Sequence, residues 1–119
     1  NMMDIFVNVS HNESFGVSVL EASACEKPVV LTSVGGLMEV AEDFVTGIFV
    51  PPANIAAVAA ALEKLIIDKN LRLTLGMNGR KKVEREYEFS TCLAKQIEIY
   101  ESVMEKNQFK KDNNKDLKE

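Results

Sequence analysis

The sequence predicts an α/β fold built on a parallel sheet. Three short apolar runs, at residues 5–9, 29–32 and 48–50, have the length and composition of buried strands. Each is followed by a polar, glycine or proline loop and then by a segment of helical periodicity. With 119 residues, 46% of them hydrophobic, the chain can bury one modest core. We therefore expect a three-layer, Rossmann-like parallel sheet, forming one domain or part of one.

Helices are expected after each strand and at the end of the chain. Their ranges are 15–25, 37–42, 55–68, 70–86 and 90 to about 104. In the first helix, Val17, Leu20 and Ala24 share one face and are predicted to be its buried side. The residues expected to cap the last three helices are Asn54, Asn70 and Ser90.

Charge and composition exclude several classes of protein. The net charge of -4 argues against a nucleic-acid-binding platform. No apolar run approaches the length of a membrane span, and no basic segment leads into a signal-like core. Cys25 and Cys92 lack metal-ligand spacing, so we expect reduced thiols in a cytoplasmic protein, with Cys25 as a small buried hydrophobe.

The end of the chain is mostly polar. From residue 107 onward asparagine, lysine, aspartate and glutamate dominate, and we expect residues 107–119 to be a disordered tail. The folded part is accordingly predicted to span residues 1–106. Before this tail, the basic residues in 80–85 alternate with glutamates and are expected to form a solvated helix face.

The chemistry is expected where the first strand meets the first helix. Glu13 and Glu21 stand eight positions apart and flank a loop that contains Gly16. A strand, a glycine loop and a helix direct free backbone N–H groups at an anion. Glu21 lies roughly 8 Å along the helix from Gly16, at about 1.5 Å per residue. A carboxylate there suits the vicinal hydroxyls of a sugar attached to a bound phosphate.

These residues begin an ordered series of motifs. After Glu13–Glu21 come Lys-Pro-Val-Val at 27–30, Gly-Gly-Leu-Met-Glu-Val at 35–40, Thr-Gly-Ile-Phe-Val-Pro-Pro at 46–52, and Gly79-Arg80. The series resembles the retaining glycosyltransferases of the GT-B fold, family 4, also called glycosyl transferases group 1. The resemblance covers about residues 3 to 104, in the order and at the spacing of that family.

The resemblance implies a fold and a role for each motif residue. The chain looks like the second half of a GT-B C-terminal domain with its closing helices, so residues 1–106 would be a partial nucleotide-sugar-binding domain. By carry-over, Glu21 would bind the nucleotide ribose. Glu13 would be the catalytic residue beside the transferred sugar. The other donor-binding positions would be Phe15, Gly16, Val17, Gly35 and Gly36.

The implied reaction moves a sugar from a nucleotide-sugar donor to a saccharide or lipid acceptor. Neither a metal nor another cofactor is expected. The implied partners are the donor and the missing N-terminal part of the enzyme, and the full enzyme would associate peripherally with a membrane.

Departures from the family concern both single residues and charge. Ser14 and Glu26 stand where glycine is frequent, and Asn54 stands where aspartate is frequent. Residues 1–69 hold nine acidic residues against three lysines and no arginine. The basic residues that neutralise the donor diphosphate in the family come from earlier in the domain. The isolated chain is therefore expected to bind donor weakly and to be inactive.

Two other interpretations remain. Paired carboxylates also serve glycosidases, but a carboxylate on a helix beside a phosphate-type loop fits transfer better than hydrolysis. Alternatively, the chain is a non-catalytic α/β module that forms a homodimer through the exposed edge of its first strand.

Overall fold

The computed structural model describes the backbone of residues 2–116 and the side chains of residues 2–106. Its elements in chain order are β1 (Phe6–Asn8), α1 (Val17–Ala24), β2 (Val29–Thr32), α2 (Leu37–Val40), β3 (Gly47–Val50), α3 (Ile55–Ile67), α4 (Lys69–Glu86) and α5 (Phe89–Asp116). The three predicted strands and five predicted helices are all present, with ends that differ from the prediction by at most two residues, apart from the end of α5, which runs further.

The strands form one parallel sheet in the order β1-β2-β3. Val7 pairs with Val30, and Val30 pairs with Ile48. All four residues of β2 are buried, which explains why this strand reads as a continuous apolar run. The α/β fold class predicted from the sequence is confirmed.

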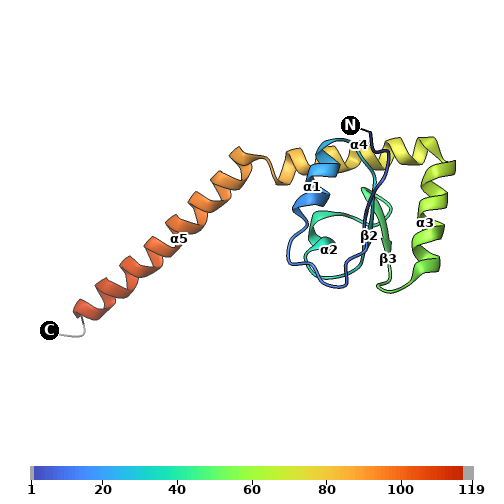
Figure 1. Ribbon diagram of the computed structural model, residues 1–119. Helices are drawn as coiled ribbons and strands as arrows, with labels where there is room; N and C mark the ends of the chain where they lie inside the picture. Colours follow the sequence, from blue (N-terminus) through green and yellow to red (C-terminus); the bar gives the residue numbers. More distant parts are fainter. Residues whose placement is uncertain (1, 117–119) are drawn as a thin grey trace. The chain divides into compact units, whose positions relative to one another are not determined.

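Helices cover both faces of the sheet, as Figure 1 shows: α1 and α2 lie on one side of the strands and α3 on the other. On the α3 side, the core consists of Val30, Ile48, Val50, Ala61, Leu65 and Leu75. On the other side, the buried residues include Val19, Val29, Leu31, Leu37 and Val40. This is the three-layer arrangement that the sequence predicts.

The buried face of α1 differs from the prediction. Val19, Ala22 and Ser23 are buried, whereas Val17 is 56% exposed. Ser23 is buried through a contact far away in the sequence, because Gly79 of α4 lies against it. Cys25, predicted to be buried, is exposed at the C-terminal end of the helix, so that prediction is wrong.

Helix α4 corrects two further predictions. Its cap is Asp68, whose Oδ1 accepts a hydrogen bond from the Leu71 amide at 2.9 Å, and not Asn70, which lies inside the helix. Lys82 belongs to the cluster expected to be solvated, yet it is buried and its Nζ lies 3.0 Å from Glu42 Oε1. The predicted cap of α3 is confirmed, since Asn54 Oδ1 accepts from the Ala57 amide at 3.0 Å.

The chain divides into two compact units, residues 1–84 and 85–119. The second unit contains α5, which begins at Phe89, so Ser90 lies inside the helix and is not its cap. Four apolar residues at helical spacing on α5 are exposed within this unit: Leu93 43%, Ile97 48%, Tyr100 61% and Met104 62%.

The predicted tail falls partly within α5. The backbone of residues 107–116 continues the helix, where the sequence predicts disorder, and residues 117–119 lie outside the described residues. The predicted domain boundary after residue 106 stays a prediction. None of the helices within residues 2–116 combines the length and the apolar character needed to span a membrane.

Candidate functional site

Three loops leave the sheet at the carboxyl ends of its strands: residues 9–16, 33–36 and 51–54. Because the strands are parallel, these loops follow the same edge of the sheet. Open α/β sheets bind their ligands at this edge. The predicted site residues Glu13, Phe15, Gly16, Gly35 and Gly36 all lie in the first two loops.

The glutamate loop and the glycine loop touch through their backbones. The Gly36 amide donates a hydrogen bond to the Glu13 carbonyl at 3.0 Å. A β-carbon at Gly35 would overlap the Glu13 carbonyl oxygen, and one at Gly36 would overlap that of Ser14. Gly35 also has a positive φ of 49°, which glycine adopts without steric cost. Both glycines are therefore required by the packing of the two loops.

The start of α1 lies beside this contact. Gly16, the residue before the helix, is buried against α2, and a β-carbon there would lie 2.8 Å from Leu37 Cδ2. No side chain caps the helix and its first turn contains no acidic residue, although the Val17 amide already donates a hydrogen bond to the Phe15 carbonyl at 3.1 Å. A helix start of this kind favours an anion. Phe15 and Val17 are 43% and 56% exposed and flank the helix start.

The two glutamates occupy different surroundings. Glu13 is half-buried in the loop that contacts Gly36, and Glu21 is exposed on α1. Glu21 lines a cavity of about 210 Å³ together with Met3, Phe6, Ser18, Ala22 and Cys25. Gly16 and Gly35, which the sequence hypothesis groups with Glu21, do not line this cavity. The structure thus brings Glu21 together with Ser18, a residue that the sequence analysis did not assign.

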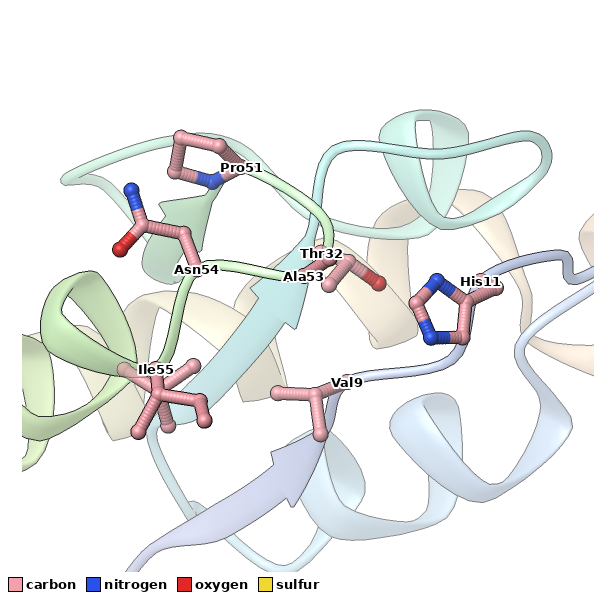
Figure 2. Close-up of a pocket in the computed structure, with 8 residues that line it drawn as sticks. Val9, His11, Thr32, Pro51, Ala53, Asn54 and Ile55 are labelled. Carbon is pink, nitrogen blue, oxygen red and sulfur yellow. The ribbon is translucent and has the colours of Figure 1, made fainter.

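A second cavity lies at the carboxyl ends of the strands, as Figure 2 shows. It has a volume of about 200 Å³ and is lined by Val9, His11, Thr32, Pro51, Ala53, Asn54, Ile55 and Val58. Thr32 Oγ1 donates to the Ser10 carbonyl at 2.6 Å, and Asn54 Oδ1 is occupied by the α3 cap, so both side chains stabilise the loops. His11 is exposed in the loop that follows β1.

The basic residue Arg80 serves the fold. Its Nη1 donates to the Ala24 carbonyl at 2.6 Å and its Nε to Glu84 Oε1 at 2.6 Å, at the C-terminal end of α1. The hydrogen bond to Glu84 raises the pKa of Arg80 above its ordinary value. Within the described part of the chain, no group of three or more histidine, cysteine, aspartate or glutamate side chains is placed to hold a metal ion.

Comparison with known proteins gives consistent matches. A family model described as "Glycosyl transferases group 1" matches residues 1–82. The capsular polysaccharide biosynthesis glycosyltransferase CapM of Staphylococcus aureus is 42% identical over 87 residues, which are 73% of this chain and 23% of CapM.

Solved structures share the fold. Anabaena HepE in complex with UDP matches with a TM-score of 0.79 at 28% identity, over 83% of this chain and 28% of HepE. HepE in complex with UDP-glucose gives a TM-score of 0.77 with the same identity and coverage. The C-terminal domain of LpcC, a glycosyl transferase group 1 family protein from Francisella tularensis, matches with a TM-score of 0.68 at 36% identity, over 73% of this chain and 45% of that domain.

Proposed function

The chain belongs to the glycosyl transferases group 1 family, and we propose that it is the donor-binding part of a retaining, family 4 glycosyltransferase with the GT-B fold. It would come from the C-terminal domain of an enzyme that moves a sugar from a nucleotide-sugar donor to a saccharide or lipid acceptor. The match to the C-terminal domain of LpcC supports this placement. The name of CapM supports polysaccharide synthesis, and the HepE complexes support a nucleotide-sugar donor.

One observation carries the proposal: the Gly36–Glu13 hydrogen bond holds the two motif loops together beside the uncapped start of α1. In our proposal the backbone amides around Phe15, Gly16 and Val17 bind the donor phosphate or sugar, and the Val17 amide exchanges its hydrogen bond to the Phe15 carbonyl for one to the donor. Glu13 orients the transferred sugar and favours positive charge developing at its anomeric carbon. Gly35 and Gly36 keep the backbone close to that sugar.

Glu21 is proposed to bind the nucleotide ribose. It lies four residues after Val17, which is about 6 Å along the helix at 1.5 Å per residue. Its carboxylate is exposed and can accept two hydrogen bonds from a diol. The hydroxyl of Ser18, one turn earlier on the same cavity, would assist.

The chain alone is proposed to bind donor weakly and to be inactive. Residues 1–69 carry no arginine and three times as many acidic residues as lysines, so they offer little compensation for a diphosphate. The chain spans 23% of CapM and 28% of HepE. We propose that the rest of the enzyme supplies the basic residues and the acceptor domain. Its location would be the cytoplasm, with peripheral attachment to a membrane.

Calorimetric titration of UDP and UDP-glucose against this chain tests the proposal. We expect saturable binding with a Kd weaker than about 1 μM, equivalent to about -8 kcal/mol. Glu21→Gln should weaken it, because the amide replaces one acceptor oxygen by a donor. Glu63→Gln, an exposed glutamate on α3, is the matched control and should leave binding unchanged. Sub-micromolar binding would contradict the proposal that the donor site is incomplete. Equal affinities of wild type and Glu21→Gln would contradict ribose binding by Glu21.

A second candidate function is self-association through β1. This strand ends the sheet, and Val7 and Val9 at that edge are 39% and 45% exposed. Sedimentation of the chain over a range of concentrations tests it. Self-association through β1 would be supported by a homodimer in which the Val7 amide becomes more protected from hydrogen exchange as concentration rises. A monomer at all concentrations would contradict it.

A further inference from the structure

The sheet has a second end strand, β3, opposite β1. End strands present unpaired N–H and C=O groups that can template pairing with another chain. In β3 the Val50 carbonyl faces β2, since it accepts a hydrogen bond from the Ser33 amide at 3.0 Å. The backbone groups of the alternate residues, Gly47 and Phe49, therefore face away from β2, toward any strand that would be added.

The loop of residues 42–46, here named the edge loop, occupies these outward groups. Asp43 Oδ1 accepts a hydrogen bond from the Phe49 amide at 2.9 Å. The Phe44 amide donates to the Gly47 carbonyl at 2.8 Å. One donor and one acceptor that a further strand would use are thus bonded inside the chain.

Helix α4 anchors the edge loop. Asn78 Nδ2 donates to the Val45 carbonyl at 3.0 Å, and one turn later Lys82 pairs with Glu42. Inside the loop, the Glu42 amide donates to Thr46 Oγ1 at 2.9 Å, and Thr46 is buried. The loop is therefore fixed at both of its ends, and Asp43 is held in place to bond Phe49.

Apolar surface lies next to the closed edge. Phe44 is 55% exposed, with Lys64 Nζ 4.9 Å from its ring centroid. A groove of about 280 Å³ beside β3 is lined by Phe44, Ile48, Phe49, Val50, Ala57, Ala60, Ala61 and Lys64. An open edge beside this groove would combine free backbone groups with apolar area, which together drive strand addition.

We propose that the edge loop prevents β3 from pairing with a second copy of this chain. The Asp43 carboxylate oxygen, which accepts the hydrogen bond of the Phe49 amide, is essential for this effect. Removal of this oxygen frees the Phe49 amide and lets β3 pair with β3 of another copy. Within the described residues, no comparable loop bonds to the outer side of β1. The inference does not depend on donor binding.

Amide hydrogen exchange and sedimentation of Asp43→Ala, Asp43→Asn and wild type test this role of the edge loop. Asp43→Ala removes the acceptor, whereas Asp43→Asn removes the charge and keeps Oδ1 as an acceptor. At low concentration we expect the Phe49 amide of Asp43→Ala to exchange about tenfold faster than in wild type, as for a locally opened edge. At high concentration its sedimentation coefficient should rise and Phe49 should become protected again. Asp43→Asn should match wild type in both measurements.

Three outcomes with the Asp43 variants would overturn the proposal. The first is an Asp43→Ala chain that keeps wild-type exchange at Phe49 and wild-type sedimentation. The second is Asp43→Asn associating like Asp43→Ala, which would assign the effect to charge. The third is association that protects Val7 of β1 and leaves Phe49 open. If Asp43→Ala does not fold, Asn78→Ala is the test variant. It removes the hydrogen bond to the Val45 carbonyl and changes no residue of β3. Unchanged exchange of the Phe49 amide in that variant would contradict the proposal.

Discussion

Gly76 of α4 packs directly on the backbone of Glu26: a β-carbon at Gly76 would overlap the Glu26 carbonyl oxygen. Glycine in a helix interior costs up to about 1 kcal/mol relative to alanine. Here the close approach of two backbones requires it, because α4 crosses the C-terminal end of α1 at this residue. From the sequence alone, one would predict only that Gly76 destabilises the helix.

Gly76→Ala should therefore destabilise the chain despite its better helix propensity. The new β-carbon meets backbone, which cannot rotate away, so we expect a loss of about 1–3 kcal/mol in the free energy of unfolding. Urea unfolding followed by circular dichroism measures it. Gly79→Ala is the matched comparison, since its β-carbon would lie 3.3 Å from Ser23 and needs only a small shift. Equal stabilities of wild type and Gly76→Ala would show that α4 can move off α1.

Glu26 itself is strained. It has a φ of 58°, and its amide and that of Lys27 donate to the Ser23 and Ala22 carbonyls, which is the Schellman arrangement that usually places glycine here. Glu26→Gly should raise the free energy of unfolding by about 0.5–1 kcal/mol, because glycine adopts this conformation without a clash. Glu26→Ala keeps the β-carbon and should show no such gain. A gain in both variants would assign the effect to the lost charge.

Arg80→Lys tests the clamp between α4 and α1. Arginine bonds the Ala24 carbonyl and Glu84 at the same time, and an ammonium group cannot match this fork. The melting temperature should fall more for Arg80→Lys than for Glu84→Gln, which removes only the exposed ion pair. If Glu84→Gln lowers it as much, the Ala24 contact contributes nothing.

The pH dependence of this clamp follows from the raised pKa of Arg80. A cation with a raised pKa in the folded state contributes stability that is fully present below its ordinary pKa. This stability is lost only as pH rises through the raised value. The difference between wild type and Arg80→Lys should therefore be the same at pH 6 and pH 9. A difference that shrinks within this range would contradict an arginine-specific contact.

The sheet and most of its elements follow from the sequence because each depends on local patterns. Residues 29–32 form a continuous apolar run, and Asn54 is a residue that caps helices. The buried face of α1, the burial of Lys82 and the exposure of Cys25 were missed. The burial of Ser23 depends on Gly79 of α4, and the burial of Lys82 accompanies its ion pair with Glu42 of the edge loop. Such contacts between distant residues leave no periodic signal.

The site was predictable to a similar extent. The order of the motifs places Glu13, Gly16 and Gly36 at the carboxyl edge of the sheet. Their spacing could not reveal that Gly36 bonds Glu13, nor that Glu21 lies in a cavity with Ser18. The first depends on how the loop after β2 folds back on the loop after β1, and the second on Met3 and Phe6, which line the same cavity as α1. The roles of these residues in donor binding stay predictions.

Gly36→Ala separates loop packing from ligand binding. Gly36 has a φ of -65°, which alanine adopts freely, so the only obstacle is the overlap of the new β-carbon with the Ser14 carbonyl oxygen. The loops must then separate, and we expect the free energy of unfolding to fall by about 1–3 kcal/mol. UDP affinity should fall in the same variant, because the loop that holds Glu13 and leads into α1 moves with Ser14.

Both quantities can be measured on the same samples, by urea unfolding and by UDP titration. Ser33→Ala, an exposed position in the same loop, is the control; it loses only a long hydrogen bond of 3.5 Å to the Val50 carbonyl and should change both quantities far less. Glu21→Gln should lower the affinity for UDP and leave the free energy of unfolding unchanged. Its carboxylate is exposed and, among the described residues, makes no hydrogen bond or ion pair with either loop. If Gly36→Ala loses affinity while its stability stays at the wild-type value, the glycine serves the ligand directly. If it keeps both, the Gly36–Glu13 contact does not hold the site together, and the proposed donor site loses its main structural support.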